Sequence, residues 1–541
     1  MAFRQNDTHI HQTSLFNDFL ALSDKKQKLL RESWAATFRN DIIPNINEEL
    51  FRPLFDEEGS ASRPNSPINV LVGASILQVM YGFSEKELMQ NIAFDFRFSY
   101  ALCLDSINED AFCDRTLRRF HKRIADYCAA TGIDLIKQTM EDLAEELASI
   151  MDIDLSKRRM DSFMIDMTAK RMGRRELVYE ANKGLVQYLF FIGDTEGILH
   201  LNHYTEQEDH NRVLYNVPKE YVKYRDSALL NDACLLMQKC GDAYRTEKAF
   251  TVFARVINEQ TILNEDGTRR FRTKEDGGMS SSMMQGISDP DATYRSKAGK
   301  SHYGYVANIE ESVGEDSSLI TSYAFETNNV SDQQMLRERV NELPPQEKHT
   351  VIVADGGYDD DIAREKAAEK NIEIITTDLL GQDTDPVYGG FQFNEEGTEV
   401  ESCPHGNTPI ENRYDEKTGK CTATFAADQC DQCPYRLTCK PSGKRGDTRK
   451  VKVSKKMAKR ARQQVEMTRA SFQKYGMFRN GVETIPSYFR AVLNVDHMYA
   501  YNKIRNSIYF GIRVMAYNVM KTTGFRKKQR EKSAVNVLLG A

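Results

Sequence analysis

The segment His349-Thr-Val-Ile-Val-Ala-Asp-Gly-Gly-Tyr358 constrains the fold of this chain more than any other. Its apolar and mainly β-branched run, residues 351–354, predicts a short strand that is buried on both faces. Asp355 follows at the end of that strand, and Gly356-Gly357 allow the chain to turn sharply. A carboxylate beside such bare backbone can meet a metal ion or a phosphate group. The alternative is structural: Asp355 would only open the turn before a helix at 359–370.

The elements around this strand indicate an α/β domain. A candidate strand at 159–168 carries Asp161 among apolar neighbours, and mostly helical sequence follows from 176 to a polar loop at 288–300. The remaining elements are expected to be strands at 302–310, 319–326 and 372–376 and a helix at 331–343. With the helical stretch treated as an insert, this is the element order of a ribonuclease H-like fold with a mixed five-stranded sheet. Since the first and fourth strands are neighbours in that topology, Asp161 and Asp355 would meet.

The 541-residue chain is too long for one core, and its first 150 residues predict a separate all-α domain. One of the expected helices, at 114–128, carries Arg118, Arg119 and Lys122. These side chains form either a solvated helix face or a surface that contacts DNA phosphates. No apolar run is long enough to span a membrane and the N-terminus lacks a signal-peptide core, so we expect a cytosolic protein.

Five of the ten cysteines lie close together, between Cys403 and Cys439. Cys430-Asp-Gln-Cys433 forms a C-x2-C pair, and in a reducing compartment such thiolates favour Zn²⁺ over disulfides. The alternative is a cluster of reduced thiols. The favoured ligands are Cys403, Cys430, Cys433 and Cys439, with Cys421 or His405 as substitutes.

The most basic segment follows directly, at 440–462. It contains eleven lysines and arginines and a single acid, Asp447, although the whole chain has a net charge of −6. A run of this kind attracts a polyanion, so we expect contact with nucleic acid, against the alternative of a solvated face. The basic residues are Lys440, Lys444, Arg445, Arg449, Lys450, Lys452, Lys455, Lys456, Lys459, Arg460 and Arg462.

Farther on, Arg479, Glu483 and Arg490 are spaced so that a helix would carry all three on roughly one face. A glutamate flanked by cations could complete a metal site while the cations hold phosphate. Pro486 should begin or kink the helix, which would place Glu483 in its first turn.

Taken together, these residues resemble the DDE transposases of bacterial insertion sequences. Asp161, Asp355 and Glu483 match the catalytic triad of that family, and Arg479 and Arg490 match the cations that the family carries around the glutamate. Tyr475 departs from the family spacing by one position. The resemblance extends to the N-terminal helical region, to the segment 291–300 with Lys300, and to the cysteine insert. It therefore covers nearly the whole chain.

The resemblance implies a transposase that cleaves DNA strands at transposon ends and joins them to target DNA. Two Mg²⁺ or Mn²⁺ ions on the three carboxylates would assist an in-line attack on the phosphodiester, while Zn²⁺ in the insert would be structural. Arg479, Arg490 and Lys300 would hold phosphates, as would Lys455, Lys456, Lys459 and Arg460. The protein would act as a homodimer on double-stranded DNA in the bacterial cytoplasm, at the nucleoid.

Two rival functions remain at this point: a catalytically inactive DNA-binding regulator of the element, and a Mg²⁺-dependent phosphohydrolase of small substrates. The expected division of the chain is a helical DNA-binding domain at 1–150, a catalytic core at 157–380 and 471–525 with a helical insert at about 176–300, a cysteine-rich and basic insert at 381–470, and a basic C-terminal tail at 526–541.

Overall fold

The computed structural model describes residues 2–6, 18–56, 65–104, 112–241, 243–297, 299–379, 383–443, 446–498 and 500–539. Lys444 and Arg445 of the basic segment lie outside these residues, as does Ala298 of the polar segment 288–300.

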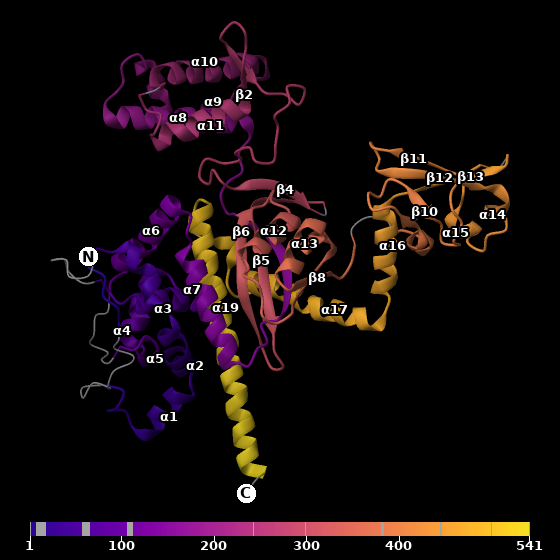
Figure 1. Cartoon of the computed structure of the whole chain (residues 1–541). Coiled ribbons are helices and arrows are strands. Elements are labelled where there is room, and N and C mark those ends of the chain that lie inside the picture. Colours follow the sequence, from indigo (N-terminus) through magenta and orange to yellow (C-terminus); the bar gives the residue numbers. More distant parts are fainter. Residues whose placement is uncertain are drawn as a thin grey trace.

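A mixed sheet of six strands forms the centre of the molecule (Figure 1). Strand β5 lies antiparallel between β6 and β1, β1 runs parallel to β7, and β7 runs parallel to β8. The order β6-β5-β1-β7-β8 is that of a ribonuclease H-like fold, so the predicted fold class is confirmed. The strands are β1 (Lys157–Asp166), β4 (Thr293–Lys297), β5 (Lys300–Val313), β6 (Ser318–Thr327), β7 (Thr350–Ala354) and β8 (Ile372–Thr376).

The parallel pairing of β1 with β7 brings two distant carboxylates to one edge of the sheet. Arg159 lies opposite Val353 in this register. Two residues farther along the two strands come Asp161 and Asp355. The predicted contact between the first and fourth strands is therefore present, and β7 is buried as its apolar sequence indicated.

Each face of the sheet is covered by helices. On one face, α12 (Asp332–Glu342) and α13 (Asp361–Glu369) pack their apolar residues against β1, β7 and β8. On the other, α18 (Thr484–Ala491) and the long helix α19 (Lys503–Leu539) pack against β1, β5 and β6 together with the N-terminal helices. Because side chains alternate along a strand, Met160 of β1 lies in the first layer and Phe163 in the second.

The N-terminal region is all-α, as predicted, and it packs directly on the domain that contains the central sheet. Helix α7 contacts both β6 and α19, and α3 is buried along most of its length. Ser84 and Glu87 form a capping box that starts α4. In the described parts of the chain, no helix combines the length and apolar character that a membrane crossing needs. The longer helices are α3 (Ile68–Tyr81), α4 (Glu85–Phe94), α6 (Asp114–Thr131) and α7 (Leu135–Ile150).

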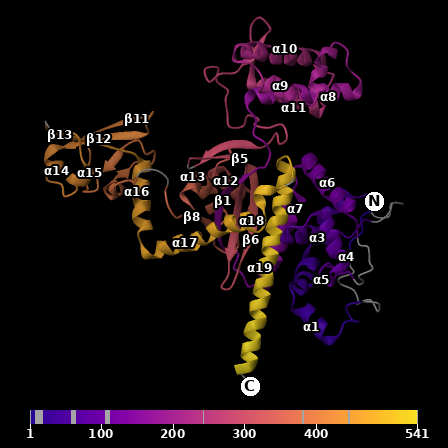
Figure 2. The same cartoon turned by 180° about the vertical axis from the view of Figure 1, so that it is seen from behind.

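Two inserts leave the sheet on different sides and form lobes of their own (Figures 1 and 2). The first contains α8 (Arg174–Ile192), α10 (Val222–Cys240) and α11 (Lys248–Gln260), which share a separate apolar core. The second contains β11 (Glu411–Asp415), β12 (Lys420–Ala426) and β13 (Thr448–Val453), which form a small sheet with its own core. Helix α16 (Lys455–Met467) then leads back to the central domain through α17 (Ala470–Asn480).

Three features differ from the sequence-based expectation. Residues 293–297 form the sixth strand β4 rather than a loop; its polar side chains are held by Asn328, which accepts a hydrogen bond from Thr293 (2.7 Å). The first insert also contains a short hairpin of β2 (Thr261–Leu263) and β3 (Arg269–Phe271). Finally, residues 526–539 are not a separate tail but the end of α19, held in part by the ion pair of Arg526 with Asp41 (2.8 Å).

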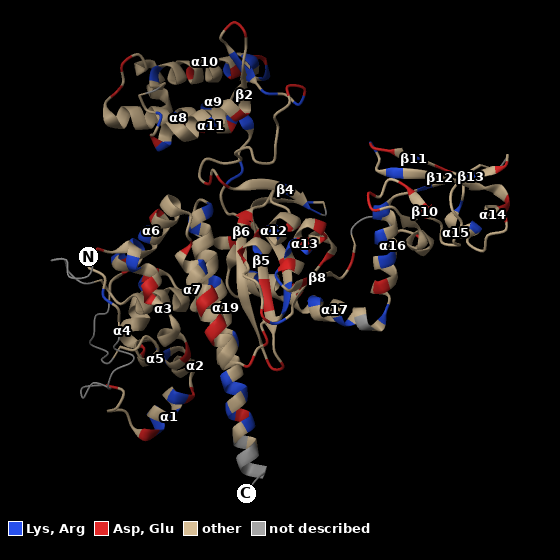
Figure 3. Cartoon of the chain, viewed as in Figure 1, with Lys and Arg blue, Asp and Glu red and all other residues tan. Residues whose placement is uncertain are grey.

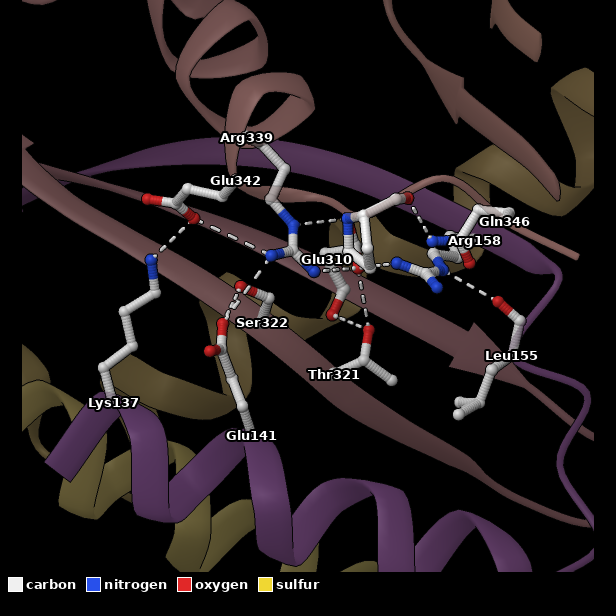
Figure 4. Close-up of polar contacts among 11 residues, drawn as sticks. Lys137, Glu141, Leu155, Arg158, Glu310, Thr321, Ser322, Arg339, Glu342 and Gln346 are labelled. Carbon is white, nitrogen blue, oxygen red and sulfur yellow. Dashed lines mark hydrogen bonds and ion pairs between the residues drawn. The ribbon is translucent and has the colours of Figure 1, made fainter. Parts of the chain in front are cut away.

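A buried ionic network ties the N-terminal region to the core (Figure 4). Glu310 of β5 is 1% exposed and accepts hydrogen bonds from Arg158 (3.0 Å) and from Arg339 of α12 (3.0 and 3.1 Å). Arg339 also lies 3.7 Å from Glu141 of α7. Burial by itself would raise the pKa of Glu310, but the charges of Arg339 and Arg158 outweigh it and lower the pKa to about 2. Opposite charges in a buried network thus join three layers of the molecule.

We expect Glu310→Gln to destabilise the protein by about 3–5 kcal/mol at pH 7, because it leaves two buried guanidiniums without their carboxylate. The folded pKa of Glu310 lies below its ordinary value of 4.5, so its contribution is complete above that pH and is lost as the pH falls towards about 2. Urea unfolding of wild type and variant at pH 7 and at several values below 4.5 measures both effects.

The matched control is Glu347→Gln, which changes an exposed glutamate nearby. It should leave the free energy of unfolding within about 0.5 kcal/mol of wild type. Equal stability of Glu310→Gln and Glu347→Gln at pH 7 would contradict the role of the network.

Candidate active site

Three carboxylates from distant parts of the chain converge at the edge of the sheet. Asp161 lies on β1, and Asp355 follows β7, where its Oδ1 accepts a hydrogen bond from the backbone N–H of Gly357 (2.8 Å). Glu483 ends the short helix η8 (Gly481–Glu483) and immediately precedes α18. Pro486 lies in the first turn of α18, where no intrahelical N–H is needed, so Glu483 occupies the helix start as predicted.

The guanidinium of Arg479 lies between these three carboxylates. Its Nη2 is 3.4 Å from Asp161 and 3.6 Å from Asp355, and its Nη1 is 2.5 Å from Glu483. The Nε of Arg479 is buried and has no hydrogen-bond partner among the described residues. One cation therefore contacts all three carboxylates, and part of its hydrogen-bonding capacity is unused.

The three carboxylates differ in their exposure. The side chain of Asp161 is 14% exposed, that of Asp355 32% and that of Glu483 56%. Burial raises the pKa of Asp161 to about 6, although the charge of Arg479 opposes the rise. Burial raises the pKa of Asp355 as well. Carboxylates that are costly to ionise gain most from added positive charge, so this site favours cations.

Two further carboxylates, Asp332 and Asp378, surround Asp355. Asp332 accepts a hydrogen bond from Ser162 (2.6 Å), and Asp378 accepts one from the N–H of Gly356 (2.5 Å). The negative charges of both raise the pKa of Asp355 further. The sequence interpretation missed them, although Asp378 lies two residues after the end of β8, and adjacent parallel strands end at the same edge.

The other cations proposed for phosphate binding lie in different settings. Lys300 is exposed in the β4–β5 hairpin, paired in register with Lys297. Lys297, which the sequence interpretation passed over, is close enough to lower the pKa of Asp161 by its charge. Arg490 of α18 donates to the carbonyl of Met164 (2.7 Å) and lies 3.3 Å from Asp496, so it helps to hold α18 on the sheet.

Three other carboxylates near the triad in the sequence lie apart from this cluster. Asp166, at the far end of β1, is 3.1 Å from the His302 ring. Asp359 pairs with Arg364, and Glu466 pairs with Arg469 at 2.8 Å. Each is engaged with a cation or a histidine of its own.

The four cysteines favoured as zinc ligands surround a single cavity of about 20 Å³, which His405 also lines. Burial raises the pKa of the Cys439 thiol to about 12, and the sulfurs of Cys430, Cys403 and Cys433 add to this rise. The four sulfurs are therefore close enough to interact electrostatically. Cys421 lies instead in β12, where its thiol donates to Asn412 (3.3 Å).

Lysines and arginines recur along α16 (Figure 3), and several of their side chains attach this helix to the rest of the molecule. Lys455 donates to the carbonyl of Glu395 (2.6 Å), Lys459 pairs with Asp361 of α13, and Arg460 donates to the carbonyl of Leu379 (3.3 Å). The side chains of strand β13 are alternately exposed and buried, so that Arg449 is buried while Lys450 and Lys452 are exposed. Lys450, Lys452 and Lys456 therefore form the more accessible basic surface.

On α6, the predicted DNA-contacting residues are all exposed. Arg118 lies 3.2 Å from Glu85 and also pairs with Asp114, and Lys122 lies 2.5 Å from Asp126. Exposed ion pairs of this kind contribute little to stability, so both cations remain accessible to a polyanion.

As they stand in the described residues, no three aspartate, glutamate, histidine or cysteine side chains are placed to hold one metal ion. At the sheet edge the carboxylates converge on a guanidinium rather than on one another. Their oxygens are nevertheless the donors that Mg²⁺ and Mn²⁺ prefer, whereas the sulfurs of the insert suit Zn²⁺.

Two family models match the chain. The model described as "Transposase DDE domain" matches residues 268–519, and the model described as "Transposase domain (DUF772)" matches residues 27–123. Asp355 and Glu483 lie within the first match and Asp161 precedes it. Comparison with curated proteins and with solved structures gives no match.

Proposed function

The chain belongs to the DDE transposases of insertion-sequence type, and on that premise we propose that it cleaves DNA strands at transposon ends and transfers them into target DNA. Asp161, Asp355 and Glu483 are the proposed catalytic carboxylates. The observation that carries this proposal is their convergence on Arg479, because they are supplied by segments more than a hundred residues apart. A hydrolase of small phosphorylated substrates gives Glu483 and the basic surface no function.

The proposed cofactor is Mg²⁺ or Mn²⁺, held by the three carboxylates. The guanidinium of Arg479 compensates the negative charge of the three carboxylates, and bound divalent ions would compensate that charge in its place. Such ions activate the attacking water or 3′-hydroxyl and stabilise the leaving oxygen. Their binding would release Arg479, whose planar fork is suited to holding a DNA phosphate.

The backbone prepares two of the carboxylates for this role. The N–H of Ser162 donates to Asp161 (2.9 Å) and that of Gly357 to Asp355 (2.8 Å), so one oxygen of each carboxylate is fixed and the other remains available. Glu483 is the most exposed of the three and would complete the site from the side of α18. Ligands fixed in advance need less ordering when DNA and metal arrive.

DNA is the proposed partner, with different roles for different surfaces. The N-terminal helical region, with Arg118, Arg119 and Lys122, would recognise the transposon ends. Lys450, Lys452 and Lys456, together with Lys300 of the core, would contact backbone phosphates. The family resemblance further suggests a homodimer in the DNA complex and residence at the bacterial nucleoid.

The triad is tested by Asp161→Asn, Asp355→Asn and Glu483→Gln, which remove a charge and preserve shape. Each should slow strand cleavage at least about 10²-fold, the effect of losing one electrostatic stabiliser, while end binding stays nearly unchanged. Cleavage of labelled end DNA with Mg²⁺ or Mn²⁺ measures the first effect, and a mobility shift without metal measures the second.

Glu466→Gln is the matched control, because this exposed glutamate pairs locally with Arg469, and it should cleave at the wild-type rate. A triad variant that still cleaves would remove that residue from the proposed site. A wild-type protein that binds the ends but cleaves nothing with either metal would instead be a DNA-binding regulator.

We also propose that Cys403, Cys430, Cys433 and Cys439 hold a structural Zn²⁺. The purified protein should then contain about one tightly bound zinc per chain, because a closed four-ligand site contributes folding energy locally. Elemental analysis should show the zinc lost from Cys430→Ser and retained by Cys421→Ser, whose sulfur lies in β12. A wild-type protein free of zinc would refute this proposal.

The exposed basic surface is tested by the triple variant Lys450→Gln, Lys452→Gln and Lys456→Gln. Binding to end and random DNA should weaken about equally, and the salt dependence should flatten by roughly one unit of slope for each phosphate that the variant no longer neutralises. Fluorescence anisotropy across a series of salt concentrations measures both quantities. Lys455, Lys459 and Arg460 are less suitable for this test because each also anchors α16.

The control is Arg118→Gln with Arg119→Gln, which should reduce the preference for transposon ends more than the affinity for random DNA. If the triple variant lost only its end preference, the roles of the two surfaces would be reversed.

A further inference from the structure

A second arginine, Arg159, connects the catalytic strand to the segment that carries Glu483. It lies on β1 two residues before Asp161, so both side chains lie on the same face of the sheet. Its Nε and Nη2 each lie 2.6 Å from Oε2 of Glu311, the residue opposite it on β5. The Arg159 side chain is 10% exposed and that of Glu311 1%.

The remaining arm of this guanidinium reaches α17. Nη1 of Arg159 donates to the carbonyl of Phe478 (2.6 Å), and the guanidinium carbon lies 5.4 Å from the centre of the Phe478 ring. Phe478 directly precedes Arg479, and Glu483 lies five positions after Phe478. Arg159 therefore fixes the backbone next to both residues on which the site depends.

Gly481 makes this approach possible. A Cβ atom at this position would lie 2.1 Å from Nη1 of Arg159. The backbone of Gly481 is in an ordinary helical conformation, with φ −63°, so glycine is needed there for space rather than for backbone freedom. The turn between α17 and η8 thus rests directly on the buried guanidinium.

We propose that Arg159 is a positioning residue, which holds the 478–483 turn on β1 so that Glu483 reaches the two aspartates. This inference rests on the proposed function of the triad. Glu311 orients the guanidinium, and the carbonyl of Phe478 sets the distance between α17 and the strand. A shift of about 1 Å in such a group can slow a reaction about 10²-fold.

The first test is the double variant Arg159→Met with Glu311→Met. Replacing both buried charges by apolar side chains of similar length avoids an unpaired charge and should preserve the fold. Strand cleavage should fall about 10²-fold, half-saturation with Mn²⁺ should require a higher concentration, and DNA binding should stay unchanged. Hydrogen exchange should accelerate at 478–483 but not in β7.

The second test disturbs the same interaction from the other side. Gly481→Ala should produce the same changes, because the added methyl group displaces the guanidinium. Gly476→Ala is the matched control: it lies on the preceding helix α17, and outside its chain neighbours and the backbone of that helix no atom lies within 4 Å of the added Cβ, so cleavage should match wild type. Arg159→Lys should keep part of the activity that the double Met variant loses, since it retains the charge but not the fork.

The outcomes separate this inference from the proposed function. A folded Arg159→Met and Glu311→Met protein with wild-type cleavage, Mn²⁺ requirement and exchange would overturn the positioning role. If the wild type itself does not cleave DNA, the proposed function fails. Mn²⁺ binding and hydrogen exchange at 478–483, compared between wild type and the double Met variant, then decide whether Arg159 positions Glu483. If both are unchanged in the variant, that role is overturned. Weaker Mn²⁺ binding with faster exchange in the variant supports it.

Discussion

Strand β1 is paired on both sides and covered on both faces, and this double burial determines how charge is distributed in the core. Side chains that alternate along it enter two different layers. Arg158 enters the layer of α12 and meets Glu310, whereas Arg159 enters the layer of α17 and meets Glu311. A shift of one residue would move every side chain of the strand to the opposite face, so the burial of both faces specifies its register.

The main outline of the site follows from local sequence rules. The strand ended by Asp355-Gly-Gly, the four-residue spacing of Arg479 and Glu483, and the order of the strands all appear in the structure as their chemistry indicated. Strand order mattered most, because it alone related Asp161 to a residue nearly two hundred positions away. Each of these rules depends on residues close together in the sequence or on a topology with few alternatives.

The features that were missed depend on partners distant in the sequence. Glu310 and Glu311 look like ordinary polar residues in the sequence. The arginines that pair with them in the core lie 29 positions away (Arg339) or 152 positions away (Arg158 and Arg159). Strand β4 consists of polar residues and shows no apolar alternation. It is stable as a strand because Asn328 forms hydrogen bonds with Thr293 in the folded protein. Asp332 and Asp378 lie in sequences that are ordinary for a helix start and a turn. Only the fold brings them close to Asp355. Burial of polar groups is decided by tertiary partners, which local patterns do not contain.

Helix α19 has a consequence for the order in which the chain can assemble. Phe510, Val514 and Tyr517 lie in the same apolar core as α3, α7 and the outer face of β1, and Asn518 bonds to both backbone groups of Ile320 in β6. During synthesis the N-terminal helices and all six strands leave the ribosome before this helix does. Until it arrives, the apolar face of the sheet lacks its cover, and such surfaces favour aggregation. The core is therefore completed only after α19 has been synthesised, and the nascent protein depends on that helix arriving promptly.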